Sequence, residues 1–545
     1  MKILSFNQVH DITSAFIDNG KLIFAYEAEK DTGRRHSIEL PPSLILQSFQ
    51  MSSPPDAIAF SGWHKPMDNF HTSTDAGYHG IGSESKIHHI KEILGKQMPV
   101  FSSSHERSHI MCSYGLSDFP QGQPCYVLVW EGTIGAFYYI DENLNIEKIG
   151  DVFKEPGNKY AFLYALADPA IPVLSTYIRI SDAGKLMALS AYGEDLSPSK
   201  DELNTIKHIM QLPTIFNYPN KYQMQKNKYF NIGVTNQKFK NLARKFSDAL
   251  FEVFYKFAKN KLNQKLPLLI SGGCGLNCDW NSQWKECGLF TDVFVPPCTN
   301  DTGVALGAAI DAQFYYTGNA KIKWSVYSGS YFLNDTEVSD LEGFAVHPLN
   351  LEELSKYLAD GKIFAWVQGR EEMGPRALGN RSIIAAPFST EIRDQLNRIK
   401  QRESFRPIAP ICLEEDFDMH FKHHGPSPFM LYFQKVKSPE LAGITHIDGS
   451  ARAQTVNEYH NPEVYALLKE FKRHTGFGVL CNTSLNFKGY GFINRLSDLA
   501  RFVRTRKLNG FVIGDKMYLN ESLNGFNLQH EDPKAKMYHT RYPIF

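Results

Sequence analysis

A run of basic side chains set among glycines and prolines is the part of the sequence with the clearest chemical character. The stretch from Trp366 to Glu415 contains Arg370, Arg376, Arg381, Lys400, Arg402 and Arg406. Glycine turns let backbone N–H groups point toward a bound anion, and arginine grips phosphate oxygens two at a time while lysine adds a point charge. This pattern predicts a phosphate-binding site. The alternative is a basic surface loop whose cations form ion pairs with Glu371, Glu372 and Glu403.

Two histidines one helical turn apart form a second candidate site. A serine within residues 102–104 can cap a helix that begins there, and His105 and His109 then share one face, as in a bidentate metal chelate. The string also satisfies H-E-x-x-H, the zinc-peptidase pattern, with Glu131 as an imaginable third ligand. The other interpretation is an ordinary pair of histidines on a capped helix, with no metal.

Three further segments have the character of ligand-binding loops. A predicted buried strand, Leu268–Ile270, runs into the glycine turn Ser271–Asn277, where backbone can approach a nucleotide closely. Asp301 follows a predicted strand and precedes a helix, so it could bind a metal or cap the helix. The polar loop 8–13 joins two predicted strands, a common place for a ligand-facing residue. The chain has no G-x-x-x-x-G-K-[ST] motif, which excludes a P-loop NTPase.

The strand pattern near the N-terminus occurs twice. The first set is Lys2–Phe6, Ser14–Ile17 and Leu22–Tyr26, with a type I′ turn at Asn19–Gly20. The second set is 126–129, 136–140 and 146–149. Such a duplicated unit begins each half of the actin, sugar-kinase and Hsp70 class of ATP-binding folds. We therefore predict an α/β protein whose N-terminal domain is actin-like, with two duplicated subdomains.

The remainder of the chain predicts an insertion and a second domain. Residues 197–235 are polar and have the character of an insertion or lid, whereas 234–262 carry the apolar period of a core helix. Residues 315–348 lack helical periodicity, so we place the domain boundary there and predict domains at 1–335 and 345–545. The second domain alternates strands with helices around the cationic stretch and is predicted to be a compact α/β unit.

Composition narrows the functional class. Lys plus Arg and Asp plus Glu both number 58, so the net charge is zero and a nucleic-acid partner is not expected. No apolar run approaches the roughly 20 residues that span a bilayer, and the N-terminus lacks a secretion signal. The 8 cysteines form no C-x-x-C pair, which predicts reduced thiols in a cytoplasmic protein.

Four long strings carry a family resemblance. They are Q-G-R-E-E-M-G-P-R-A-L-G-N-R-S-I, K-Q-R-E-S-F-R-P-I-A-P, H-I-D-G-S-A-R-A-Q-T-V and N-T-S-L-N. With them, the chain resembles the O-carbamoyltransferases of the nodulation-protein and antibiotic-tailoring type, over roughly residues 3–515. The resemblance implies a Kae1-like (actin-like ATPase) domain at 1–335 and a YrdC-like domain at 345–545.

The resemblance also implies an activity in two steps. The C-terminal domain would condense carbamoyl phosphate with ATP, which gives carbamoyl-adenylate and pyrophosphate. The N-terminal domain would then transfer the carbamoyl group to a hydroxyl of a sugar or other small-molecule acceptor, with a divalent metal (iron or another ion) and Mg²⁺ as the implied ions. The family analogy further suggests a homodimer without nucleic-acid or membrane partners. Two alternatives stay open, namely a non-catalytic actin-like nucleotide-binding protein and the zinc peptidase.

Residue roles follow from the matched motifs. For carbamoyl phosphate the matching residues are Arg402, Arg406 and Ser484, with Lys400 and Arg406 as catalytic groups. For ATP they are Arg35, Gly272, Gly273, Asn277, Arg376, Arg452 and Asn482. For the metal they are His105, His109, Glu131 and Asp301. For the acceptor they are Asp182 and His10, and His10 could orient the attacking hydroxyl or take its proton.

Two positions depart from the family pattern. Glu131 stands where an aspartate ligand is usual, and its side chain reaches one methylene further. Arg35 stands where a nucleotide-contacting lysine is usual. We therefore expect the metal and acceptor end of the protein to differ from its relatives more than the donor end does.

Overall fold

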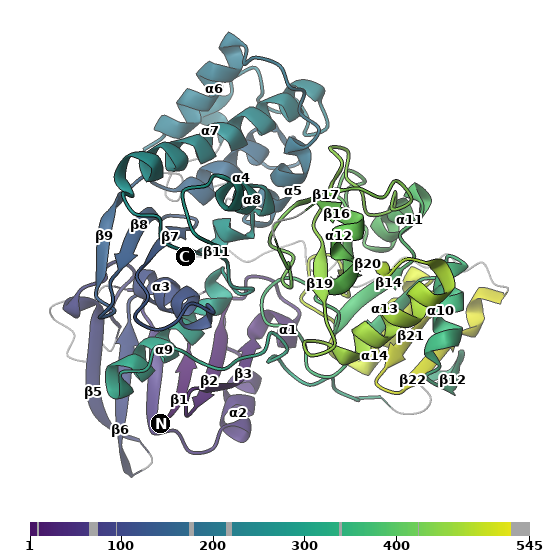
Figure 1. The fold of residues 1–545 in the computed structure, drawn as a ribbon, viewed down its shortest axis with the longest axis horizontal. Helices are drawn as coiled ribbons and strands as arrows, with labels where there is room; N and C mark the ends of the chain where they lie inside the picture. Colours follow the sequence, from purple (N-terminus) through teal and green to yellow (C-terminus); the bar gives the residue numbers. More distant parts are fainter. Residues whose placement is uncertain are drawn as a thin grey trace.

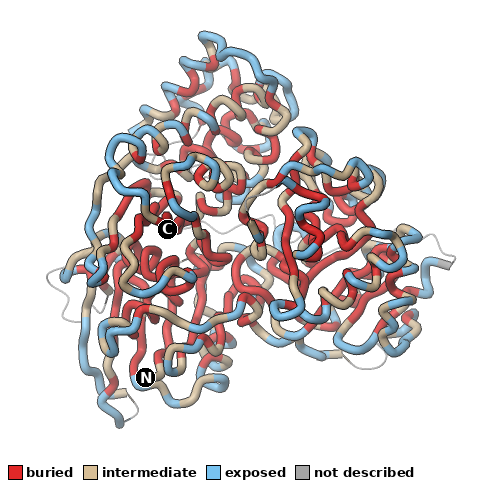
Figure 2. Tube along the Cα trace, in the orientation of Figure 1, coloured by how far each residue is buried: buried red, intermediate tan, exposed pale blue. Residues whose placement is uncertain are grey.

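A computed structural model describes residues 1–7, 10–64, 75–93, 95–173, 179–213, 221–336, 341–422 and 425–524. It is an α/β protein built on three large sheets and one small one, which confirms the predicted class (Figure 1). Buried segments concentrate in the sheet strands and in the helices between them (Figure 2). No helix among these residues is long and apolar enough to cross a membrane.

The first sheet has six strands in the order β3-β2-β1-β4-β6-β5. They are β1 (Lys2–Phe6), β2 (Thr13–Asp18), β3 (Lys21–Glu27), β4 (Ala57–Ser61), β5 (Lys86–Ile93) and β6 (Lys96–Ser103). Strand β1 pairs antiparallel with β2 and parallel with β4. The φ angles of Asn19 (48°) and Gly20 (77°) are both positive, as a type I′ turn requires. The short helices α1 (Ala28–Thr32) and α2 (Pro42–Met51) follow β3.

The second sheet repeats this pattern in the order β11-β10-β7-β8-β9. Its strands are β7 (Cys125–Trp130), β8 (Gly135–Ile140), β9 (Ile146–Asp151), β10 (Leu268–Ser271) and β11 (Val293–Phe294). Strand β7 pairs antiparallel with β8 and parallel with β10, as β1 does with β2 and β4. The duplicated subdomains that the sequence predicts are therefore present.

Two helices form the layers between these sheets. Helix α9 (Val304–Thr317) packs on the first sheet, helix α3 (His105–Leu116) packs on the second, and the two helices pack on each other. The second subdomain also carries the helices α4 (Pro156–Ala167), α5 (Ser181–Ser190), α6 (Lys200–Gln211), α7 (Gln237–Lys261) and α8 (Cys278–Glu286). The predicted insertion contributes α6, which packs on α7; its residues 214–220 lie outside the described ranges.

The C-terminal part is built on an eight-stranded sheet in the order β12-β22-β21-β13-β14-β20-β15-β19. Its strands are β12 (Phe344–Pro348), β13 (Phe364–Val367), β14 (Arg381–Ala385), β15 (Ala409–Leu413), β19 (Gln454–Val456), β20 (Val479–Ser484), β21 (Gly510–Ile513) and β22 (Lys516–Asn520). A small sheet joins β16 (Phe421–Lys422), β17 (Gln434–Val436) and β18 (Ser450–Ala451). The helices are α10 (Leu351–Ala359), α11 (Thr390–Ile399), α12 (Phe417–His420), α13 (Pro462–Thr475) and α14 (Leu496–Arg506).

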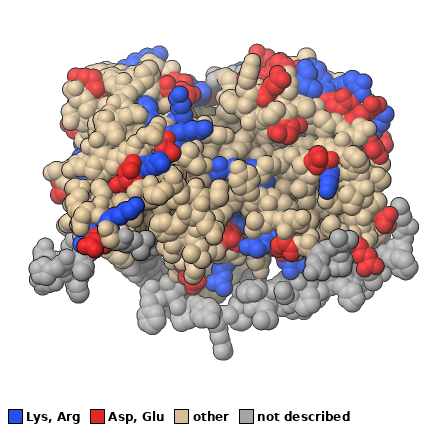
Figure 3. Space-filling model, turned by 90° about the horizontal axis from the view of Figure 1, so that it is seen from below, with Lys and Arg blue, Asp and Glu red and all other residues tan. Residues whose placement is uncertain are grey.

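The C-terminal part contacts the second subdomain through many polar bonds. Asn281 Nδ2 donates to the Leu431 carbonyl (2.9 Å), and Tyr432 Oη donates to the Val293 carbonyl (2.9 Å). The surface in Figure 3 mixes basic and acidic side chains over the face seen from below, as expected for a chain with zero net charge.

The contact between α3 and α9 depends on one glycine. A Cβ atom at Gly307 would lie 1.9 Å from the backbone oxygen of Ser108. No side chain fits at that distance, so only glycine lets the two helices approach this closely.

Gly307→Ala is therefore expected to force the helices apart and to destabilise the protein by about 1–3 kcal/mol, the usual range for overpacking. Thermal unfolding by circular dichroism measures this effect. Gly184→Ala is the matched control, because Gly184 lies inside helix α5 with open space where its Cβ would be. The control should unfold at the same or a higher temperature. Equal unfolding temperatures for the two variants would contradict the packing argument.

Candidate functional site

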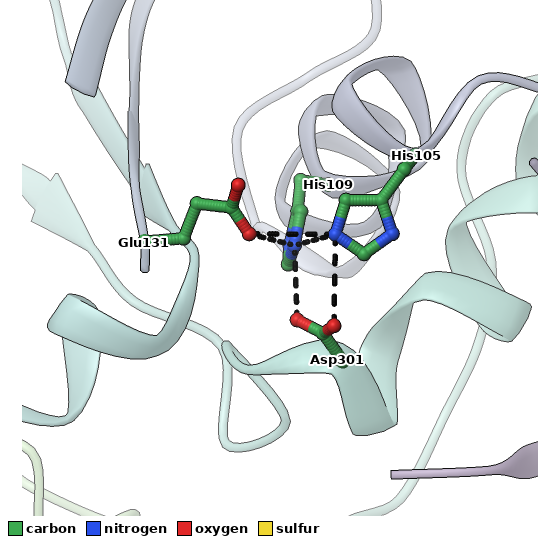
Figure 4. Close-up of side chains that lie close together, drawn as sticks. All are labelled: His105, His109, Glu131 and Asp301. Atoms are coloured by element: carbon green, nitrogen blue, oxygen red, sulfur yellow. Dashed lines mark hydrogen bonds and ion pairs between the residues drawn. The ribbon is translucent and has the colours of Figure 1, made fainter. Parts of the chain in front are cut away.

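Four buried side chains from three separate segments of the N-terminal part point toward one another (Figure 4). His105 Nε2 and His109 Nε2 lie 3.1 Å apart. Glu131 Oε2 lies 3.4 Å from the first nitrogen and 3.5 Å from the second. Asp301 places Oδ2 3.6 Å from His105 Nε2 and Oδ1 3.4 Å from His109 Nε2. We call these four residues the His–carboxylate cluster.

The fold positions each member of this cluster by a local feature. Helix α3 begins at the N-cap Ser104, whose hydroxyl accepts a bond from the Arg107 backbone N–H (3.1 Å). Arg107 then forms a two-pronged ion pair with Asp311 of α9, at 2.7 and 2.8 Å. This buried pair fixes α3, which carries the histidines, against the helix that follows Asp301.

Neighbouring groups orient the ligand atoms. Glu131 Oε1 accepts bonds from the Tyr78 hydroxyl, from Thr133 Oγ1 (2.9 Å) and from the Ile134 backbone N–H (3.3 Å), which leaves Oε2 facing the histidines. The Tyr78 ring also stacks on His105, with centroids 4.4 Å apart. His109 Nδ1 lies 3.2 Å from Ser271 Oγ. These contacts hold the longer glutamate in a position where it still reaches the cluster.

The donor set fits a divalent cation. Two imidazole nitrogens and two carboxylates converge in a buried space, and their separations put a common centre roughly 2 Å from each donor, the length of zinc–nitrogen and zinc–oxygen bonds. Without a cation, the two carboxylates would face each other in the protein interior, where charge is costly to bury. The cluster therefore could hold a metal ion.

Glu106, the glutamate of the H-E-x-x-H string, points away from this cluster. Its carboxylate accepts bonds from the Gly80 backbone N–H (2.7 Å) and the Tyr138 hydroxyl, and it lies 3.3 Å from Lys148 Nζ. A zinc peptidase needs this carboxylate beside the metal-bound water. The geometry thus does not support the peptidase alternative.

His10, for which the family resemblance implies a role at the acceptor, lies beside the cluster. Its Nε2 is 3.1 Å from Asp301 Oδ2, and its Nδ1 is 3.5 Å from Asp11 Oδ2. The adjacent Gln8 and Val9 lie outside the described residues. Asp182 is placed elsewhere, in α5, where it is bound by Arg179 (2.8 Å) and Lys185 (3.0 Å). No contact between Asp182 and His10 is present among the described residues.

The predicted phosphate-binding stretch divides into two groups of cations. Arg370 donates to the carbonyls of Ile23 (2.7 Å) and Gly329 (2.7 Å), and the buried Arg381 donates to Gln368 O (2.7 Å). The guanidinium groups of these two arginines donate to backbone carbonyls and are therefore not directed at an anion. Including them in the phosphate site was therefore wrong.

The other cations form one electropositive group, which we call the cation cluster. Its members are Arg376, Lys400, Arg402, Arg406 and Arg452, which repel one another, and Arg35 adds to the field from the N-terminal part. The nearest carboxylate is Glu403, with Oε2 3.9 Å from Arg406. Three buried polar atoms in this region have no hydrogen-bond partner among the described residues, namely Arg376 Nε, Arg452 Nε and Asn482 Oδ1.

Burial and mutual repulsion lower the pKa values of cations in this cluster. Burial and the neighbouring Arg402, Arg35 and Arg406 hold the pKa of Lys400 well below its usual range. Burial and Arg452 likewise lower the pKa of Arg376. Lys400 Nζ also donates to the backbone oxygen and hydroxyl of Ser484, at the end of β20. An anion placed here would reduce the repulsion and could accept bonds from Arg376 Nε and Arg452 Nε, which have no partner among the described residues.

The glycine turn of the N-terminal part touches the cation cluster directly. Gly272 adopts φ 98°, and a Cβ there would lie 2.5 Å from the Trp130 carbonyl, so the turn requires glycine. Arg376 Nη2 donates to the Leu276 carbonyl in this turn (3.0 Å). Asn277 caps α8 through bonds from Asp279 N (3.1 Å) and Trp280 N (3.4 Å). The predicted ATP-binding residues of both parts of the chain thus meet at one contact.

Comparison with known proteins shows to which family the chain belongs. A model of the carbamoyltransferase N-terminus matches residues 84–310, and a model of the carbamoyltransferase C-terminus matches residues 355–520. The chain is 44% identical to a 3'-hydroxymethylcephem-O-carbamoyltransferase of Amycolatopsis lactamdurans, over 95% of this chain and 99% of that relative. The chain belongs to the carbamoyltransferase family.

Other members of the carbamoyltransferase family show how wide the relationship is. A 3'-hydroxymethylcephem-O-carbamoyltransferase of Streptomyces clavuligerus is 43% identical over 95% of this chain and 99% of its own length. Nodulation protein U of Bradyrhizobium diazoefficiens is 31% identical over 90% of this chain and 93% of its own length. The predicted family and the predicted enzyme class, a carbamoyltransferase, are thus confirmed.

Three site residues escaped the sequence analysis of this carbamoyltransferase. They are Tyr78, which binds Glu131, Asp11, which lies between His10 and His36, and Ser271, which lies beside His109 Nδ1. Ser271 was recognised only as the start of a turn. Tyr78 and Asp11 belong to no motif, so their roles emerge only from the folded structure.

Removing the hydroxyl of Tyr78 tests how Glu131 is held. Tyr78→Phe keeps the ring on His105 but deletes one of the bonds to Glu131 Oε1. We expect divalent-metal affinity to fall by about 10- to 100-fold, the usual effect of losing such an outer partner. Competition with a chromophoric chelator measures this affinity, and Tyr459→Phe at a fully exposed tyrosine is the control. Unchanged affinity in Tyr78→Phe, with affinity lost in His109→Ala, would refute this role for Tyr78.

The depressed pKa of Lys400 predicts proton-linked anion binding. A bound anion stabilises the ammonium and raises this pKa, so the complex holds more protons than the free protein. Affinity for sulfate, whose own charge is constant here, should fall as pH rises toward the usual lysine value of about 10.4. Calorimetry in buffers of different ionisation enthalpy detects the proton uptake. Lys400→Met should bind sulfate more weakly and lose the uptake, and an uptake that persists in this variant would contradict the assignment.

Proposed function

We propose that this carbamoyltransferase works in two stages at two neighbouring sites. The cation cluster activates carbamoyl phosphate with ATP, and the His–carboxylate cluster serves transfer to the acceptor. The observation that carries this proposal is the bond from Arg376 to the Leu276 carbonyl, because the glycine turn that contains Leu276 begins at Ser271, whose Oγ lies 3.2 Å from His109 Nδ1. Separate family models for residues 84–310 and 355–520 support the division into domains 1–335 and 345–545.

In the first stage, the cation cluster brings two polyanions together. Arg406 and Ser484 would bind carbamoyl phosphate with Lys400 and Arg402. Arg376, Arg452 and Asn482 would bind ATP, with Arg35 completing the field from the N-terminal part. The buried, unpartnered Nε donors of Arg376 and Arg452 support these roles, because a preorganised donor stabilises developing charge without rearrangement.

The atoms of this stage balance with one water molecule. Carbamoyl phosphate transfers its phosphoryl group to water, which gives inorganic phosphate and carbamate. An oxygen of this carbamate then attacks the α-phosphorus of ATP. The new oxygen–phosphorus bond gives carbamoyl-adenylate, and pyrophosphate leaves. Holding the two reactants next to each other in one cluster of cations would supply most of the acceleration that proximity offers.

In the second stage, the acceptor oxygen attacks the carbamoyl carbon and AMP leaves. His10 lies 3.1 Å from Asp301 and can orient the attacking hydroxyl or take its proton. His105, His109, Glu131 and Asp301 would hold iron or another divalent ion. A bound ion of this kind would neutralise charge on the leaving phosphate. Its four donors are fixed before the acceptor binds.

The relatives indicate the class of acceptor. Two relatives that are 44% and 43% identical over nearly their whole length act on 3'-hydroxymethylcephem. We propose a primary hydroxymethyl group on a small ring compound of the cephem class. Competing a hydroxymethylcephem against an oligosaccharide under single-turnover conditions distinguishes this class from the sugar acceptors that the sequence alone left open.

Pyrophosphate release tests the two-stage proposal. It should require both ATP and carbamoyl phosphate, and it should not require acceptor. Arg406→Ala should lower the rate by at least 100-fold, whereas Arg398→Ala, which removes an exposed arginine of α11, should leave it unchanged. His109→Ala should retain pyrophosphate release and lose carbamoylation of the acceptor. Release that is independent of carbamoyl phosphate, or equal loss in the His109 and Arg406 variants, would overturn the proposal.

A further inference from the structure

Three successive basic residues, Arg34, Arg35 and His36, follow helix α1. Figure 1 shows α1 between the first sheet and the C-terminal part, and the Gly491 backbone N–H donates to the Gly33 carbonyl (3.1 Å) across this contact. Arg35 contributes to the repulsion within the cation cluster, so its neighbour His36 lies close to that site. His36 itself belongs to neither cluster.

The Asp11 carboxylate joins His36 to the proposed site of transfer. Its Oδ1 lies 2.9 Å from His36 Nδ1, and its Oδ2 lies 3.5 Å from His10 Nδ1. Asn300 Nδ2 also donates to Oδ2 (3.3 Å). His10 in turn lies 3.1 Å from Asp301. A single carboxylate therefore separates His36 from the residue that is proposed to orient the acceptor hydroxyl.

His10 and His36 are partly exposed to solvent, unlike the cluster beside them. Their side chains are 30% and 34% exposed, whereas none of the four members of the His–carboxylate cluster exceeds 7%. An acceptor that comes from solvent can therefore contact both histidines without displacing any part of the cluster.

The backbone at both ends of the Asp11–His36 contact adopts an uncommon conformation. The φ angle is 52° at Asp11 and 54° at His36, in the left-handed region that few residues other than glycine occupy. The Ile12 backbone N–H donates to the Ser37 carbonyl (3.5 Å), which joins the two segments. Residues held in this region cluster at ligand sites, where the surrounding fold maintains them. The position of the His36 ring is thus set by the fold before a ligand binds.

The contact with Asp11 decides which atom of His36 can meet a ligand. Nδ1 is directed at Asp11, and Nε2 has no hydrogen-bond partner among the described residues. Burial alone would lower the pKa of His36, and Arg35 acts in the same direction, but the bond and charge of Asp11 with the charge of Glu29 raise this pKa above its ordinary value. A protonated ring presents an N–H donor and a positive charge at Nε2. That combination suits an anionic oxygen.

We infer that His36 binds an anionic group of the acceptor, close to the hydroxyl that receives the carbamoyl group. Arg34 supports the same preference, because its ion pair with Glu39 (3.5 Å) lies at the surface, where such pairs are weak. The inference rests on the proposed function for the place of transfer beside His10. It adds that the acceptor carries negative charge next to its reacting hydroxymethyl group, a feature that neutral sugars lack.

Two acceptors that differ only in charge test this inference. A 3-hydroxymethylcephem-4-carboxylate bears its carboxylate on the ring carbon beside the one with the hydroxymethyl group, and its methyl ester is neutral. Wild type should bind the carboxylate at least about tenfold more tightly than the ester, as expected for a charge-assisted hydrogen bond. Titration calorimetry without ATP measures both affinities, so no turnover is needed.

His36→Asn is designed to remove only the contact with the ligand. Asparagine can direct its amide N–H at Asp11 and tolerates the left-handed conformation, but it lacks the positive charge and the Nε2 donor. This variant should bind carboxylate and ester with affinities within twofold of each other. His474→Asn is the matched control, because His474 is also paired with a carboxylate, Glu470 (3.2 Å), but lies in helix α13. The control should keep the wild-type preference.

The outcomes separate this inference from the proposed function. If wild type binds carboxylate and ester equally, or if the preference persists in His36→Asn, the inference fails alone. Equal weakening of both ligands in His36→Asn would also overturn it, because His36 would then support the fold rather than recognise charge. If wild type binds neither compound, the proposed acceptor class fails and the inference fails with it. Pyrophosphate release needs no acceptor, so it tests the first stage independently.

Carbethoxylation with diethyl pyrocarbonate gives a second measurement on wild type alone. The reagent modifies accessible imidazole nitrogens, and mass spectrometry of peptides locates each modified histidine. A saturating concentration of the carboxylate should protect His36 and leave His474 as reactive as before. Modification of His36 that continues unchanged at saturation would contradict the inference. This experiment remains decisive if His36→Asn does not fold.

Discussion

The repulsion among the closely spaced cations of the cation cluster is the interaction on which the rest of this structure depends. Arg376, Lys400, Arg402, Arg406 and Arg452 lie close together with Glu403 as the nearest carboxylate. Such a group disfavours the folded state until an anion binds, so the surrounding packing must hold it in place. The eight-stranded sheet supports the segments that carry these cations. Arg376 also donates a hydrogen bond to the glycine turn of the N-terminal part. Affinity for phosphate-bearing substrates follows from charge that the protein leaves uncompensated.

The His–carboxylate cluster buries negative rather than positive side chains. Glu131 and Asp301 are buried carboxylates that face two imidazoles, and the close packing of α3 on α9 at Gly307 holds the segments that carry them. One site therefore attracts anions and the other suits a cation, and several bonds, among them that from Arg376 to the Leu276 carbonyl, join the parts of the chain that contain them. The two charges also give each site selectivity for its own partner.

Sequence reasoning recovered the duplicated strands because their alternation and turns are local signals. The long motifs identified the family and most of both clusters. Local pattern did not distinguish Arg370 and Arg381 from the other arginines, because only tertiary structure shows that backbone carbonyls occupy their guanidinium groups. The β5–β6 hairpin was missed as well, since its exposed, charged first strand has weak periodicity. Tyr78 escaped notice because a lone tyrosine far from any motif carries no sequence signal for a contact with Glu131.

The most direct test of this account is the exchange of radiolabelled pyrophosphate into ATP by protein stripped of metal with a chelator. If the cation cluster alone forms the adenylate, exchange should require carbamoyl phosphate and should proceed at an undiminished rate without metal, while transfer to any acceptor stops. Exchange that disappears with the metal, or that occurs without carbamoyl phosphate, would contradict the separation of activation from transfer.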